Sequence, residues 1–196
     1  MFDLKLLWDR ARYILVQPVK AWERIRSENR SLKDVHKSFL VPVLVLLSVS
    51  AFAGTLIYSP AGLSIIFPFI KGIKQFVCFY ATVLFTAWVI NELSLAFVQK
   101  KDYNLNFKLV AYSLTPLYLT VFITRFLPDL GILNILALYG SYILFTGLKT
   151  IENISRQGII RYFIVALLTI VVFYLSISWI TRSLLEGVYF AVAGSV

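Results

Sequence analysis

Apolar runs of about 20 residues constrain this chain more than any other feature, because that is the length a helix needs to cross a bilayer. Five such runs cover residues 39–58, 76–98, 107–127, 131–149 and 159–181. Their hydrophobicity is continuous, whereas the strands of a transmembrane β-barrel alternate apolar and polar residues. The sequence therefore predicts an all-α polytopic membrane protein, built as a bundle of five transmembrane helices with an amphipathic N-terminal arm.

The arm is expected to be cytoplasmic and to cover residues 1–38, which carry too much charge to cross a membrane, and the membrane domain to cover residues 39–196. Residues 2–16 predict an amphipathic helix, since apolar side chains recur at helical spacing on one face. The members of this face are Leu4, Leu7, Trp8, Ala11, Ile14 and Leu15. Pro18 suits the first turn of a second helix, where its missing N–H needs no partner. Such an arm lies either on the lipid surface or on the protein's own cytoplasmic face, and the sequence leaves both open.

Proline and glycine punctuate the membrane domain at two places. Residues 59–75 contain three residues that interrupt helices, namely Pro60, Pro68 and Gly72. A short interfacial or re-entrant segment is therefore expected there, rather than a further crossing. Inside the third span, Pro116 has no N–H to donate to the carbonyl group of Tyr112, and a kink is expected at that point.

The distribution of basic residues sets the expected orientation of the chain. Fifteen of its 19 Lys and Arg residues lie on the N-terminal arm or in the loops after the second and fourth spans. Because basic loops stay in the cytoplasm, we expect a cytoplasmic N-terminus and a C-terminus outside the cell membrane. Anionic lipid headgroups account for the net charge of +9, and no nucleic-acid partner is expected.

Asn91 and Glu92 interrupt the apolar run "AWVINELSLAF" inside the second span. At about 1.5 Å per residue, Glu92 lies roughly 9 Å from the inner end of that span. A carboxylate at the membrane centre costs about 2.5–3.5 kcal/mol, and less near the interface, so Glu92 should be protonated, paired or facing water. We expect Glu92 to face the bundle interior and to accept a hydrogen bond from the third or fourth span.

Hydroxyl groups of the third and fourth spans are expected at the same depth as Glu92, and with it they define a candidate polar cluster. The candidate binding residues of this cluster are Glu92, Asn91, Tyr112, Ser113, Ser141 and Tyr142. The cluster is either a structural hydrogen-bonded clasp between helices or a site for a proton, an ion or a small ligand. A third alternative places Glu92 shallow enough to reach water directly.

Enzymatic and metal-binding arrangements find little support in the sequence. His36 and Cys78 are the only residues of their types, which is too few for a zinc site of the usual kind. No glycine-rich phosphate-binding loop is present, and no pair of aspartates falls within the spans. We therefore expect a protein that is not an enzyme and that has no catalytic residue, cofactor or metal.

Three motifs in order along the chain carry a resemblance to a known family. "QPVKAWERI" at 17–25 precedes the first span, "AYSLTPLYL" at 111–119 lies in the third and "LYGSYILFTGLK" at 138–149 in the fourth. With this order and spacing, the chain resembles the Yip domain family of Ypt/Rab-interacting polytopic membrane proteins, in its prokaryotic branch, over roughly residues 12–181. The resemblance implies five membrane helices and a cytoplasmic N-terminus. The small-GTPase role of eukaryotic members is not carried over, because their Asp-Leu-Tyr-Gly-Pro motif has no counterpart before or within the first span.

The leading hypothesis for function is a non-enzymatic integral membrane protein that organises membrane or recruits partners. The alternative is a small transporter or channel for an ion, a proton or a small solute, which would use Glu92 as its intramembrane carboxylate. Expected partners are membrane lipids, with anionic headgroups at the N-terminal arm, and a protein partner or a second copy of the chain is also compatible with the sequence.

Overall fold

The apolar runs form long helices in the computed structural model of the protein, which describes residues 4–28, 30–58, 65–97, 101–151 and 156–187. Within that part of the chain, five helices are long and apolar enough to cross a membrane. They cover Leu32–Tyr58, Ile66–Phe97, Tyr103–Phe126, Pro128–Thr150 and Gly158–Leu185. The prediction of an all-α polytopic membrane protein is confirmed.

Two short helices precede the spans and form the arm. Helix α1 covers Leu4–Val16, and α2 covers Pro18–Ser27 with its proline in the first turn, as the missing N–H predicts. A capping box then starts the first span: the Asp34 N–H donates to Ser31 Oγ, and the Ser31 N–H donates to the Asp34 carboxylate. This span consists of α3, the π-helical turn η1 and α4, with bounds Leu32–Val35, His36–Leu40 and Val41–Tyr58.

The remaining spans are built from seven elements of the described chain. Helix α5 forms the second span, α6 and α7 the third, the 3-10 helix η2 and α8 the fourth, and α9 with the π-helical turn η3 the fifth. Their bounds are Ile66–Phe97, Tyr103–Ser113, Thr115–Phe126, Pro128–Leu138, Tyr139–Ile151, Arg156–Thr181 and Arg182–Glu186.

Helix α5 corrects the expectation of a separate interfacial segment ahead of the second span. The helix is continuous over residues 66–97. Pro68 stands in its first turn, where no N–H has a partner within the helix, and so it does not interrupt the helix. Gly72 lies against the backbone carbonyl of Ser48 in α4, so it serves close packing of two helices. Residues 59–64 of the expected segment lie outside the described part of the chain.

The third span divides into α6 and α7 at the point where the sequence predicts a kink. Leu114, between the two helices, has φ −80° and ψ 0°. Pro116 cannot donate to the carbonyl of Tyr112, and the Thr115 hydroxyl donates to that carbonyl instead, at 2.6 Å. The carbonyl that the proline leaves free is therefore satisfied within the third span.

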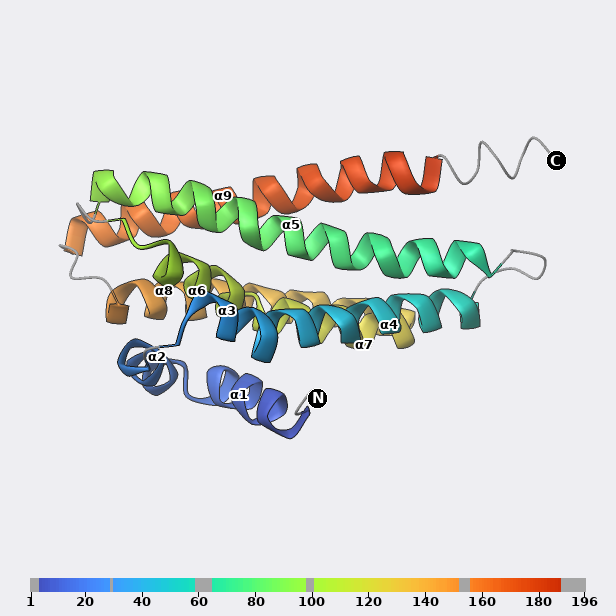
Figure 1. Cartoon of the computed structure of the whole chain (residues 1–196), viewed down its shortest axis with the longest axis horizontal. Helices are drawn as coiled ribbons and strands as arrows, with labels where there is room; N and C mark the ends of the chain where they lie inside the picture. Colours follow the sequence, from blue (N-terminus) through green and yellow to red (C-terminus); the bar gives the residue numbers. More distant parts are fainter. Residues whose placement is uncertain (1–3, 29, 59–64, 98–100, 152–155, 188–196) are drawn as a thin grey trace.

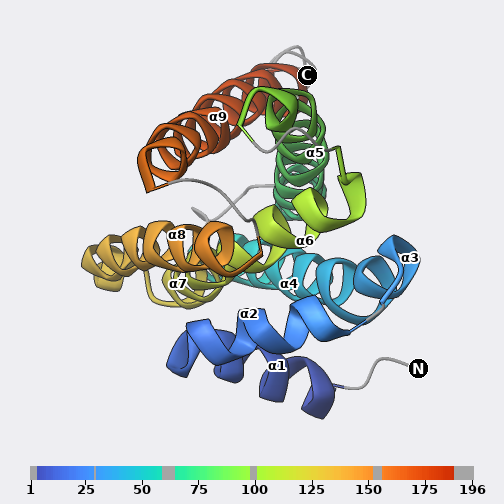
Figure 2. The ribbon, with the colours of Figure 1, turned by 90° about the vertical axis from the view of Figure 1, so that its left-hand side faces the viewer.

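The helices are arranged in layers, which Figure 2 shows from one end of the bundle. Helices α5 and α9 lie side by side in one layer, and α4, α6, α7 and α8 lie in the next. The arm covers the side of this second layer that faces away from α5 and α9, with α2 against α8 and α1 against α7. Helices α4 and α9 end at the same end of the bundle, away from the arm (Figure 1).

Candidate functional site

The structure does not place Glu92 inside the bundle. Ile90, Asn91 and Ser94 form the buried face of α5 at this level, and Glu92 lies on the exposed face, about 100° further round the helix from Asn91. The Glu92 carboxylate forms an ion pair with Lys101, and the two side chains are 47% and 40% exposed. The expectation that Glu92 faces the interior is therefore wrong, because the helical phase of α5 turns this side chain outward.

Asn91, in contrast, belongs to a buried polar contact between three spans. Asn106 Nδ2 of α6 donates to Asn91 Oδ1 of α5 at 3.3 Å, and the Tyr162 hydroxyl of α9 donates to Asn106 Oδ1 at 3.3 Å. The three side chains are almost completely buried. Hydrogen bonds between helices replace those that water cannot supply inside a membrane protein. The contact joins α5, α6 and α9, and Asn106 and Tyr162 were not among the residues predicted for the polar cluster.

The hydroxyl-bearing residues of the predicted cluster lie in different places. Tyr112 is fully buried, whereas Tyr142 is 47% exposed and stacks on Tyr139 with ring centroids 5.5 Å apart. Ser113 and Ser141 line one largely apolar cavity of about 320 Å³ between α8 and α9, and Ser141 donates its hydrogen bond to the carbonyl of Leu138, at the end of η2 in the same span. The six residues predicted as a cluster therefore do not form one site.

Trp22 attaches the arm to the bundle. Its side chain is completely buried, and its Nε1 donates to the backbone carbonyl of Ile143 in α8 at 2.9 Å. The indole meets the ring of Tyr112 in α6 edge-on, with centroids 6.2 Å apart. A Cβ atom at Gly147 would lie 2.7 Å from Trp22 Cε2, so glycine is needed there to make room for the indole. Helix α2 is thus seated against α6 and α8 instead of lying free on the lipid.

The three sequence motifs meet where Trp22 packs against α6 and α8. Trp22 comes from the first motif, Tyr112 from the second and Gly147 from the third. A family model described as the Yip1 domain matches residues 12–180. The chain belongs to the Yip1 domain family. No curated protein and no solved structure matches the chain. In this Yip1 domain the motif residues serve the attachment of the arm.

A second glycine of the third Yip1 motif brings α8 close to the break in the third span. A Cβ atom at Gly140 would lie 2.7 Å from the carbonyl oxygen of Ser113. Real Cβ atoms do not approach a backbone oxygen so closely, and small residues are the usual means of close helix approach in membranes. The motif therefore joins α8 to α6 at the level of Pro116 and, at Gly147, joins α8 to the arm about two turns further on.

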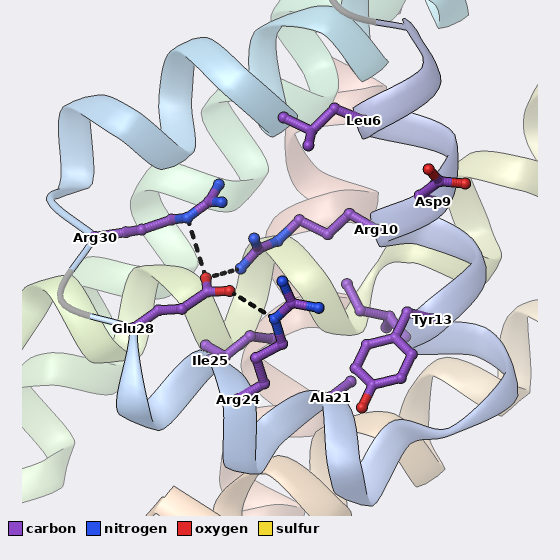
Figure 3. Close-up of a pocket in the computed structure, with 10 residues that line it drawn as sticks. Leu6, Asp9, Arg10, Tyr13, Ala21, Arg24, Ile25, Glu28 and Arg30 are labelled. Atoms are coloured by element: carbon purple, nitrogen blue, oxygen red, sulfur yellow. Dashed lines mark hydrogen bonds and ion pairs between the residues drawn. The ribbon is translucent and has the colours of Figure 1, made fainter.

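The arm of the Yip1 domain carries an ion cluster that the sequence did not reveal. Three arginines hold Glu28 at the end of α2: Arg10 of α1, Arg24 of α2 and Arg30 beyond it, at N–O distances of 2.7, 3.1 and 3.1 Å. Figure 3 shows the guanidinium groups converging on the carboxylate. Burial raises the pKa of Glu28, but the hydrogen bond from Arg10 and the three nearby positive charges outweigh burial and leave that pKa below its ordinary value of 4.5.

The cluster borders a hollow of about 110 Å³ between α1 and α2 (Figure 3). Arg10, Arg24, Arg30 and Glu28 line it, and Asp9 stands at its edge. Among the described residues, Arg10 Nε is buried and has no hydrogen-bond partner. Arg10 and Glu28 are separated by 18 positions in the sequence, and no motif spacing connects them, so only the fold of the arm brings them together.

An apolar groove of about 350 Å³ runs along another face of α1. Side chains of α1, α4 and α7 line it, among them Leu7, Trp8, Leu46, Leu47, Leu119 and Phe122. Leu4 and Trp8 are each 58% exposed, whereas Leu7 and Ile14 are buried. The apolar face predicted for residues 2–16 is thus shared, with one edge against the bundle and the other facing outward.

Proposed function

We propose that this Yip1 domain protein is a non-enzymatic membrane-organising protein whose arm acts as a fixed wedge at the inner surface of the cell membrane. One observation carries the proposal: the arm is attached to the bundle through buried Trp22, while Leu4 and Trp8 of the same arm remain exposed beside an apolar groove. Because the arm is attached, its outward apolar side chains are held at a constant depth relative to the spans.

The wedge acts on the packing of lipids. The apolar face of an interfacial helix is buried about 5–10 Å into the boundary between headgroups and acyl chains. Trp8 and Leu4 would occupy that layer, with acyl chains of the inner leaflet filling the groove beside them. Exposed basic side chains on the arm would attract anionic headgroups; they include Lys5, Arg12, Lys20 and Arg26.

The rival transport function gains no support from the position of its intramembrane carboxylate. Glu92 lines none of the cavities described above and pairs with Lys101 on an exposed face. A wet path from one side of the membrane to a buried acid is the arrangement that would favour transport. We therefore rest the proposal on the arm.

Reconstitution into vesicles of phosphatidylcholine and phosphatidylglycerol tests the wedge. The wild-type protein should draw tubules or reduce the vesicle diameter as the protein-to-lipid ratio rises, which electron cryomicroscopy measures. Trp8→Ser should lose most of this effect, because the wedge loses its largest apolar side chain. The arm should stay attached in this variant, since Trp22 is unchanged.

Trp179→Ser is the matched control for Trp8→Ser. Trp179 is also an exposed tryptophan, at 71%, but it lies in α9 and not on the arm. This control should remodel vesicles as the wild type does. Equal loss of remodelling in both variants, or vesicles that the wild type leaves unchanged, would contradict the wedge.

A further inference from the structure

We propose that the hollow between α1 and α2 binds the phosphate group of an anionic phospholipid headgroup, held by Arg10, Arg24 and Arg30. The inference rests on the proposed function, because it names the lipid class that the arm recognises. It assigns to the three arginines a second anionic partner, in addition to the Glu28 carboxylate.

The arginines have more hydrogen-bond donors than Glu28 can use. Each guanidinium carries five N–H groups, whereas Glu28 accepts a hydrogen bond from one nitrogen of Arg10 and one of Arg24 and forms an ion pair with Arg30 Nε. With Asp9 included, three positive and two negative side chains line the hollow. An anion that enters therefore finds free donors and a net positive charge.

The Arg10 guanidinium group is held in place before any ligand binds, whereas the Arg24 side chain is 68% exposed. The Arg10 guanidinium lies 5.0 Å from the ring centroid of Tyr112, and that of Arg24 lies 6.0 Å from the ring centroid of Tyr13. The Arg10 side chain is only 15% exposed. Its Nε is buried without a partner in the described part of the chain. Such preorganisation favours binding because little side-chain freedom remains to be lost.

The position of α1 explains why the anion belongs to a lipid. The groove on its other face is shared with Leu47 and Phe122, which belong to membrane spans. Arg30 of the hollow stands two residues before the first span begins at Leu32, so the hollow lies where that span meets the membrane surface. Leu6 lines the hollow and is 48% exposed, which offers an apolar contact to the glycerol and acyl part of the ligand. Guanidinium forks match the oxygens of a phosphate group, and about 110 Å³ admits that group but no peptide segment.

Titration of the full-length protein in neutral detergent with short-chain phosphatidylglycerol, followed by native mass spectrometry, tests the proposal. We expect saturable binding of this lipid and no binding of short-chain diacylglycerol, which lacks the phosphate. Arg24→Gln/Arg30→Gln should weaken the binding by about tenfold or more, because each substitution removes a charge-assisted hydrogen bond. Arg10 is left intact so that α1 stays paired with Glu28.

Arg12→Gln/Lys20→Gln is the matched control, since it removes the same charge from exposed positions of the arm that do not line the hollow. It should weaken binding less than about threefold, as expected for screened surface charges. An equal loss in both double variants would overturn the proposal in favour of diffuse attraction. Inorganic phosphate that competes as well as the lipid would assign the hollow to a soluble phosphate instead. Absence of saturable lipid binding would also overturn the proposal.

The outcomes for the hollow and for the wedge are separable. Lipid binding is measured on the detergent-solubilised protein and does not require vesicles to change shape. If the wild type does not remodel vesicles but binds lipid in an arginine-dependent way, the wedge hypothesis is rejected and a lipid-binding arm is retained. Remodelling without arginine-dependent binding would retain the wedge and remove the site.

Discussion

Replacing Gly147 by alanine should loosen the arm, because Trp22 occupies the space that the new methyl group needs. The added Cβ would lie 2.7 and 2.9 Å from Trp22 Cε2 and Cζ2, and 2.6 Å from Leu109 Cδ1. Carbon atoms in packed interiors stay about 3.5–4.0 Å apart, so these neighbours must retreat by roughly 1 Å. The indole cannot retreat without weakening its hydrogen bond to Ile143 or its contact with Tyr112.

Overpacking of this kind costs about 1–3 kcal/mol. When that cost falls on the attachment of α2, the backbone amides of residues 18–27 should exchange roughly 5- to 150-fold faster, since about 1.4 kcal/mol is a factor of ten. Hydrogen–deuterium exchange of the full-length protein in nanodiscs measures this ratio. Gly131→Ala is the matched control, because a Cβ there would meet no atom within 4 Å, and its exchange should equal that of the wild type.

The Trp22→Phe background completes the test. Phenylalanine lacks the part of the indole that the new methyl group would meet, so Gly147→Ala should cost less in this background. The difference between the two penalties should be at least about 1 kcal/mol, as for residues in direct contact. Equal penalties in both backgrounds would refute this contact as the cause. Wild-type exchange rates in Gly147→Ala would refute the attachment of the arm through Trp22.

Asn106→Leu should destabilise the protein by about 1–3 kcal/mol, because a buried amide of α5 loses its partner, and an unchanged thermal melting temperature in detergent would contradict this. Glu92→Gln should change the same melting temperature little, because an exposed ion pair contributes at most about 1 kcal/mol. The lowered pKa of Glu28 means that its ion cluster stabilises the arm above pH 4.5 and loses this contribution as the pH falls through the still lower folded-state pKa. Protection of α2 amides should therefore decline only below pH 4.5, and Glu28→Gln should remove this decline. Reporter fusions at Gly131 and at the C-terminus should lie outside and one at Tyr103 inside, and a cytoplasmic C-terminus would overturn the predicted topology.

The sequence alone determined the class of the fold and several of its breaks. Length and continuous hydrophobicity identify membrane spans, and a span in lipid must be helical because its backbone groups have no water to bind. Pro18 begins α2 and Pro116 divides the third span, as predicted from the missing proline N–H. The proline and glycine near the start of α5 misled the same reasoning, because the effect of a proline depends on whether it falls in the first turn.

The direction of each polar side chain was decided only by the tertiary structure. Counting residues gives the depth of Glu92, but one position along a helix turns a side chain by about 100°. The sequence of α5 does not show which of its faces packs against the neighbouring helices. The same holds for Arg10 and Glu28, which meet because the chain turns back between α1 and α2. Apolar side chains are accepted equally by lipid and by a neighbouring helix, so composition cannot tell the two apart. The specific shapes at Trp22 and Gly147 select the neighbour, and they exist only once α2 and α8 are packed together.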